Sequence, residues 1–200
     1  MRHKLIVYGA GGHGLVVAEA AAAQGWVVLG YRDDRLRPGT HIAAWTVIDR
    51  FDDDAHWLVA IGDNAIRGRL MNELQQSGRK LATVIHPTAV VSPSASVDEG
   101  VYIGPLAVAQ SMTRIGAGAI INTGSIVEHD NVIGDAAHIA PGSILCGRVT
   151  VGHRTLIGAG ATVMPGVRIG DDAVVGAGSM VRGDVATGQT VAGNPAKALR

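Results

Sequence analysis

Residues 115–138 read IGAGAI-INTGSI-VEHDNV-IGDAAH, and each of these four units of six residues begins with Ile or Val. Six-residue steps from Ile85 to Val181 reach 17 positions, of which 16 hold Val, Ile or Leu and one holds Ala109. Those three residue types make up 52 of the 200 residues, so chance would fill only about a quarter of the positions. A period of six is therefore the strongest pattern in the sequence.

The positions four residues after each step form a second regularity, because all of them hold Ala, Ser, Thr or Val except Asn131. A helix of 3.6 residues per turn cannot keep a period of six on one face, and a strand alternates with period two. One large and one small inward residue per hexapeptide indicate a solenoid of short strands. The pattern resembles that of left-handed parallel β-helices, which implies three hexapeptides per triangular coil and stacking of residues 18 apart.

The composition excludes several classes of partner. Seventeen Lys and Arg offset 17 Asp and Glu, so no net field favours nucleic acid or an anionic membrane. No apolar run approaches the roughly 20 residues that cross a bilayer. The first apolar run reaches glycines within four residues and has no small-residue cleavage site, so we expect no signal peptide and a cytoplasmic enzyme. The single Cys146 allows no intrachain disulfide.

The first 84 residues predict a small α/β domain of the Rossmann-like βαβ kind. We expect strands over 5–8, 26–31, 57–61 and 81–84, helices over 15–24 and 65–76, and a glycine-rich loop over 9–14. A loop of this kind before a helix directs backbone N–H groups at a phosphate. Asp33 and Asp34 follow the second strand, where dinucleotide-binding folds place a carboxylate for the ribose.

We therefore predict a nucleotide-binding domain over residues 1–84 and a β-helix with a C-terminal tail over 85–200. A full Rossmann fold needs two mononucleotide halves, and 84 residues hold about one. This favours a single nucleotide, such as a nucleotide-sugar, over NAD. An NAD-dependent oxidoreductase and a purely structural glycine turn are the alternatives.

The candidate chemistry lies in the middle of the prism, where one repeat carries Glu128-His129-Asp130. A carboxylate beside a histidine raises the basicity of the imidazole and suits it to general-base catalysis. His138 follows half a coil later, so cooperation with His129 would occur across a subunit boundary, which predicts an oligomer. Solvated turn histidines are the alternative. A zinc site formed by His129, His138 and His153 is disfavoured, because no two prism histidines have the five-residue spacing of hexapeptide carbonic anhydrases.

Taken together, these motifs resemble the sugar acetyltransferases, both the sialic-acid O-acetyltransferase type and the bacterial enzymes that N-acetylate nucleotide-linked 4-amino-sugars. The resemblance covers practically the whole chain. It rests on the glycine loop with His13, the pair Asp33-Asp34, residues 61–64, the hexapeptides with residues 128–130 and His138, and the ending 191–197.

The resemblance implies a homotrimer of left-handed β-helices with acetyl-CoA in the groove between neighbouring prisms. His129 would be the base, Asp130 would orient its ring, and Asn122 would lie beside it. The cofactor would contact His138, Ala159, Ala177 and Lys197. The residues implied for the nucleotide-sugar are Gly11, Gly12, His13, Asp33, Asp34 and Gly62.

Our leading hypothesis is direct acetyl transfer from acetyl-CoA to the amino group of a nucleotide-linked 4-amino-sugar, without a metal and without an acyl-enzyme. O-acetylation of a sialic-acid-like sugar is the first alternative. The second alternative is a non-catalytic nucleotide-sugar-binding trimer.

Overall fold

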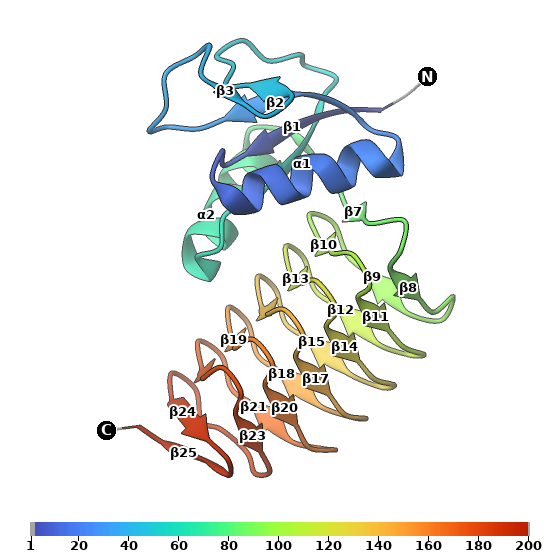
Figure 1. The fold of residues 1–200 in the computed structure, drawn as a ribbon, viewed down its shortest axis with the longest axis vertical. Helices are drawn as coiled ribbons and strands as arrows, with labels where there is room; N and C mark the ends of the chain where they lie inside the picture. Colours follow the sequence, from blue (N-terminus) through green and yellow to red (C-terminus); the bar gives the residue numbers. More distant parts are fainter. Residues whose placement is uncertain (1–2, 200) are drawn as a thin grey trace.

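A computed structural model describes residues 3–199 of the chain. A sheet flanked by two helices comes first, and a three-sided prism of short strands follows it (Figure 1). The elements of this N-terminal part are β1 (Lys4–Tyr8), α1 (Gly12–Gln24), β2 (Val27–Arg32), β3 (His41–Ile42), β4 (Trp45–Thr46), β5 (His56–Val59), α2 (Asn64–Gln76) and β6 (Lys80–Leu81).

The N-terminal sheet is parallel and has the strand order β2-β1-β5-β6. Successive residues of a strand face opposite sides, so β1 presents Val7 to α1 and Ile6 to α2. Val7 shares one buried cluster with Val17 of α1, and Ile6 shares another with Leu70 of α2. The two helices therefore cover opposite faces, as the predicted βαβ arrangement requires. Between β2 and β5 the chain forms the short antiparallel hairpin β3–β4.

Helix α1 begins at Gly12, three residues before the predicted start at residue 15. The glycine-rich segment therefore supplies the first turn of the helix as well as the loop. A Cβ on Gly14 would lie 1.9 Å from the carbonyl oxygen of Gly9, so the helix can start this close to β1 only with glycine at that position. The unpaired N–H groups of the first turn follow directly after β1.

Each face of the prism is one parallel sheet, apart from the final antiparallel strand β25. The covered face contains β7 (Val84–Ile85), β10 (Tyr102–Ile103), β13 (Ile120–Ile121), β16 (His138–Ile139), β19 (Leu156–Ile157), β22 (Val174–Val175), β24 (Thr190–Gly193) and β25 (Ala196–Ala198). The apolar face contains β8 (Val90–Val91), β11 (Val108–Ala109), β14 (Ile126–Val127), β17 (Ile144–Leu145), β20 (Thr162–Val163) and β23 (Met180–Val181). The polar face contains β9 (Ser96–Val97), β12 (Arg114–Ile115), β15 (Val132–Ile133), β18 (Thr150–Val151) and β21 (Arg168–Ile169).

The predicted stacking of residues 18 apart is confirmed, since Ile121 pairs with Ile139 and Ile139 with Ile157. The second residue of each short strand points inward, and these residues form one continuous core. Asn131, the exception among the small inward residues, is buried because its Nδ2 donates to the Glu128 carbonyl at 2.6 Å and its Oδ1 accepts from the Val149 amide at 2.6 Å. The hexapeptide pattern thus describes a three-sided parallel β-helix, the fold that the resemblance implies.

The N-terminal part packs on the covered face. Val17 and Ala21 of α1 belong to the same buried cluster as Tyr102 and Ile120 of the prism. β7, the first prism strand, lies at the boundary that we predict after residue 84. No helix among residues 3–199 has the length and apolar character to span a membrane.

Candidate functional site

A cavity of about 460 Å³ opens where β1 and β5 end. Its walls come from the start of α1, the turn after β2 and the segment between β5 and α2. Every residue predicted to bind the nucleotide-sugar lines it: Gly11, Gly12, His13, Asp33, Asp34 and Gly62.

Hydrogen bonds fix the two carboxylates of this cavity. Asp33 accepts from the backbone N–H groups of Ala10 and Arg35, each at 2.9 Å. Asp34 accepts from the Tyr8 hydroxyl at 2.7 Å and pairs with Arg32. The hydrogen bond from Tyr8 and the charge of Arg32 hold the pKa of Asp34 below its ordinary value. A pair of oriented carboxylates therefore stands at the edge of the cavity.

The glycines of the cavity leave its backbone open to a ligand. A Cβ added to Gly11, Gly12 or Gly62 would meet nothing within 4 Å, so contacts within the protein do not explain glycine there. Among residues 3–199, no side chain caps the N-terminus of α1. Free helical N–H groups beside uncrowded glycines form an anion site of the kind that binds phosphate.

His13 and Tyr102 meet at the junction of the N-terminal part and the prism. Their rings pack edge to face, with centroids 5.4 Å apart. Burial, aided by the nearby charge of Arg67, lowers the pKa of His13 to about 4. Among the described residues, Nε2 of His13 and the hydroxyl of Tyr102 are buried without a partner. We did not predict Tyr102 as a site residue. The feature that could have identified it is an aromatic residue at an outward strand position of the covered face.

Arg67 of α2 is 1% exposed and joins the two parts of the molecule. Its guanidinium donates to the carbonyls of Ile61 (2.8 Å), Gly118 (2.8 Å) and Ala136 (2.6 Å) and to the Asn64 side chain (2.7 Å). Burial lowers the pKa of Arg67 to about 10, which leaves it charged at neutral pH. The sequence contains one signal for a buried arginine that we did not use. Arg67 lies on the same, apolar face of the helix as Leu70 and Leu74.

His138 lies on the covered face, and Asn122 fixes its ring. Oδ1 of Asn122 accepts the Thr123 N–H at 2.8 Å, so its Nδ2 faces Nε2 of His138 at 3.1 Å and donates to it. Nδ1 of His138 then carries the proton. Burial and the charge of Arg67 lower the pKa of His138 to about 4, so the ring is a neutral hydrogen-bond donor at neutral pH.

His129 lies on an exposed turn between the apolar and polar faces, with 53% of its side chain accessible. Its Nδ1 is 2.8 Å from Oδ2 of Asp130. A carboxylate only accepts, so Nδ1 holds a proton, and in the neutral imidazole Nε2 then presents a free lone pair. This is the state in which a histidine acts as a general base.

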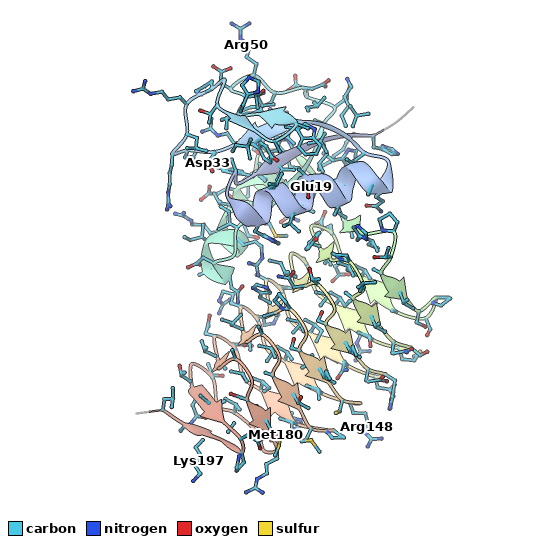
Figure 2. All side chains as sticks on the ribbon, in the orientation of Figure 1. Glu19, Asp33, Arg50, Arg148, Met180 and Lys197 are labelled. Atoms are coloured by element: carbon cyan, nitrogen blue, oxygen red, sulfur yellow. The ribbon has the colours of Figure 1, made fainter. Side chains whose placement is uncertain are left out.

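Within one chain, His129 does not meet Asn122 and His138. Asn122 follows β13 and contacts His138, whereas His129 follows β14 on another edge of the prism. Figure 2 shows Arg148, on the same edge of the prism as His129, far from Asp33 in the N-terminal part. His129 and the cavity beside α1 therefore lie on different sides of the chain.

The residues predicted for the cofactor follow one another along the covered face. His138 is in β16, Ala159 and Ala177 follow β19 and β22, and Lys197 is in β25. The sheet order places these strands in sequence toward the end of the prism. A groove of about 400 Å³ runs beside His138, Leu156 and Val174 and is bordered by the start of α2.

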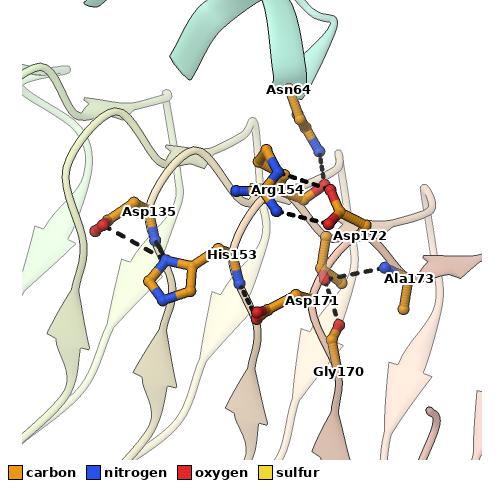
Figure 3. Close-up of polar contacts among 9 residues, drawn as sticks. Asn64, Asp135, His153, Arg154, Gly170, Asp171, Asp172 and Ala173 are labelled. Carbon is orange, nitrogen blue, oxygen red and sulfur yellow. Dashed lines mark hydrogen bonds and ion pairs between the residues drawn. The ribbon is translucent and has the colours of Figure 1, made fainter. Parts of the chain in front are cut away.

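The third edge of the prism carries a ladder of polar contacts (Figure 3). The Asp135 N–H donates to Nδ1 of His153 at 3.0 Å, and Arg154 forms a two-pronged ion pair with Asp172. Asn64 of α2 donates to the Arg154 carbonyl at 2.8 Å. His129, His138 and His153 thus lie on two edges and one face, and residues 3–199 contain no cluster of three potential metal ligands.

Two family models match the chain. Residues 4–74 match the PglD N-terminal domain, and residues 148–183 match the bacterial transferase hexapeptide of six repeats. The UDP-N-acetylbacillosamine N-acetyltransferase of Bacillus subtilis (strain 168) is 37% identical over 106 residues. That match covers 48% of this chain and 49%, about half, of the relative.

Solved structures match over nearly the full chain. The acetyltransferase domain of PglB from Neisseria gonorrhoeae FA1090 is 37% identical, with a TM-score of 0.94 over 99% of this chain and 100% of its own. It has also been solved with acetyl coenzyme A. PerB from Caulobacter crescentus, in complex with CoA and GDP-perosamine, is 38% identical, with a TM-score of 0.92 over 98% of this chain and 97% of its own. The chain therefore belongs to the family of hexapeptide-repeat sugar acetyltransferases with a PglD-type N-terminal domain.

Proposed function

We propose that this protein transfers the acetyl group of acetyl-CoA to the amino group of a nucleotide-linked 4-amino-sugar. The observation that carries the proposal is the His129–Asp130 pair, which leaves Nε2 of the imidazole free on the exposed edge of an acetyltransferase prism. The complexes of the two relatives with acetyl coenzyme A and with CoA and GDP-perosamine support the choice of both substrates.

In the proposed reaction the sugar amine attacks the thioester carbonyl while Nε2 of His129 removes a proton from the nitrogen. The tetrahedral intermediate then collapses, the C–S bond breaks, and CoA leaves as a thiolate that takes up the proton. The product is an amide. Ser125 is fully buried and its hydroxyl donates to the Asn122 carbonyl at 2.7 Å, which favours direct transfer over a serine acyl-enzyme.

His138 has the properties needed to stabilise the negative charge on the thioester oxygen. Its Nδ1 holds a proton, it borders the groove of the covered face, and it stays neutral at neutral pH. A neutral donor stabilises a developing oxyanion without supplying a labile proton of its own. Acetyl-CoA would extend from this point past Ala159 and Ala177, with its phosphates toward Lys197.

The nucleotide would occupy the cavity of the N-terminal part. Its phosphates would lie at the N-terminus of α1 beside Gly11 and Gly12, and Asp33 and Asp34 would hold the ribose or the base. His13 has a buried, unpartnered Nε2 among the described residues and would face the sugar. Gly62 would form the opposite wall.

The proposed enzyme is a homotrimer. The outward residues of the apolar face include Val90, 59% exposed, and Ile144, 37% exposed, whereas the polar face presents Arg114 and Arg168. An exposed apolar face bordered by His129 suits an interface between copies, and it would bring that base to the nucleotide cavity of a neighbour. Light scattering should give three times the mass of one chain. We place the reaction in the cytoplasm, where both substrates are made.

The test is an assay with acetyl-CoA and UDP-, GDP- and dTDP-linked 4-amino-sugars, read by release of the CoA thiol and by the mass of the product. We expect a gain of one acetyl group on the 4-amino nitrogen with one nucleotide class strongly preferred. The matching 4-hydroxy sugars test O-acetylation in the same assay. Thiol release with the hydroxy sugars alone, or with none of the compounds, would overturn the proposal.

A further inference from the structure

Gly147 lies on the turn one coil beyond His129, 18 residues later in the chain. A Cβ built on Gly147 would be 2.6 Å from both Cε1 and Nε2 of His129 and 3.3 Å from Cδ2. Carbon atoms do not approach this closely without displacing their neighbours. The imidazole therefore occupies the space that any side chain at position 147 would need.

The backbone does not explain glycine at this position. Gly124, Gly142 and Gly160 have positive φ, and an added Cβ there would meet nothing within 4 Å. Gly147 is outside the positive-φ region. Gly134, which is also outside it, is crowded by the backbone of the next coil, with the His153 amide nitrogen at 2.6 Å. At Gly147 the three nearest atoms all belong to the ring of His129.

Two contacts thus fix the imidazole. Asp130 accepts from Nδ1 on one edge of the ring, and the Cε1–Nε2 edge lies above Gly147. A methyl group on residue 147 would push away the edge that carries the free lone pair. The half-exposed ring has room to rotate outward, so the fold would survive while Nε2 lost its direction.

We propose that Gly147 is a positioning residue for acetyl transfer, because its missing side chain is what lets His129 direct Nε2 toward the substrate. This inference rests on the proposed role of His129 as the base. Gly183 offers a matched control, since it occupies the same turn position two coils further on, has no positive φ and has open space at its Cβ.

The experiment is a double-mutant cycle of Gly147→Ala and His129→Ala, with Gly183→Ala in both backgrounds. We expect Gly147→Ala alone to lower kcat by roughly 10²-fold, the scale of a 1 Å misplacement, with both KM values changed less than about twofold. In the His129→Ala background the same substitution should change the residual rate by less than about twofold. Gly183→Ala should leave kcat unchanged in wild-type background. The ring ¹⁵N signals of His129 should move in Gly147→Ala and not in Gly183→Ala.

Other outcomes separate the two proposals. A loss that is equally large in the His129→Ala background, or a loss of CoA affinity with unmoved ring signals, would overturn the role of Gly147. If His129→Ala keeps its full rate, the proposed base is wrong, while displaced ring signals in Gly147→Ala would still record the steric contact. If Gly147→Ala fails to fold but the double variant folds, the clash with the imidazole is the cause, which supports the inference.

Discussion

His129 stands on an exposed edge of the prism, whereas His138, nine residues later, lies where the N-terminal part covers the prism. The neighbour of His129 is a carboxylate, and the charge that acts on His138 is the guanidinium of Arg67. Hydrogen bonding occupies Nδ1 of the first ring and Nε2 of the second. One ring therefore keeps a free lone pair and the other a free N–H.

This difference shows that surroundings, more than residue type, decide which ring nitrogen of each histidine stays free. A carboxylate that accepts from Nδ1 leaves Nε2 of an imidazole free, while burial beside a cation opposes proton uptake. The first environment suits a base and the second suits a neutral donor. Each of the two histidines, and the charged residue beside each, can be substituted separately.

The largest effect is expected at His129, the proposed base. His129→Ala should lower kcat by about 10²–10⁴-fold, the usual contribution of general-base catalysis, and leave the affinity for acetyl-CoA unchanged. Steady-state rates and calorimetric titration measure the two quantities. His153→Ala, an exposed turn histidine on another edge, is the control and should keep the wild-type rate. Equal rates in the two variants would remove His129 from the mechanism.

The next largest effect concerns the cation beside His138. Arg67→Met should lower the free energy of unfolding by about 3 kcal/mol, because buried carbonyls of Ile61, Gly118 and Ala136 lose their donor. Urea denaturation measures the change. Arg69→Met on the same helix removes a mostly exposed ion pair with Glu73 and should cost less than about 1 kcal/mol. Similar losses in both variants would contradict the special role of Arg67.

Acid should destabilise the folded protein through the buried ring of His138. The pKa of His138 is about 4 in the folded protein and about 6.5 when unfolded, so the unfolded chain binds the extra proton. The stability associated with this residue is present above pH 6.5 and is lost as the pH falls to 4, by about 1–3 kcal/mol. The titratable and charged groups around this ring in the described part of the chain include His13, Arg67, Asp63, Arg154 and Asp172.

Urea denaturation from pH 7 to 4 measures this loss. The slope should become shallower in His138→Asn and in Arg67→Met, and His41→Asn, which changes an exposed histidine, should reproduce the wild-type curve. An unchanged slope in His138→Asn would mean that this ring is not buried in its neutral form.

The smallest effect should follow removal of the carboxylate. Asp130→Asn keeps the shape of the side chain but removes the charge from an exposed hydrogen-bond acceptor, which is worth up to about 1 kcal/mol. A decrease in kcat of up to about fivefold is expected from steady-state rates. A loss as large as that of His129→Ala would show that the carboxylate does more than orient an exposed ring.

Most of the prism could be predicted, because the period of six repeats a local rule in every coil. The stacking of residues 18 apart, the inward residues and the exposed turn that carries His129 all follow from that rule. It was also predictable that residues 11–13 and 62 would line one cavity, since the strand, glycine segment and helix are consecutive in the chain. That this cavity binds a nucleotide stays a prediction. The predicted start of α1 was wrong, because the close approach of Gly14 to Gly9 is made only on folding.

The sequence by itself determined the β-helix, the βαβ unit and the chemical identity of the candidate base. Only the tertiary structure decided the state of His138, because Arg67 reaches carbonyls 51 and 69 residues away in the chain and no short motif records such contacts. It also decided that glycine at position 147 serves His129, since the two residues meet only when one coil is laid on the next. A sequence period depends on residues that are near one another along the chain. The pKa of a side chain and the position of its ring depend on residues that are distant in the sequence and meet only in the folded protein.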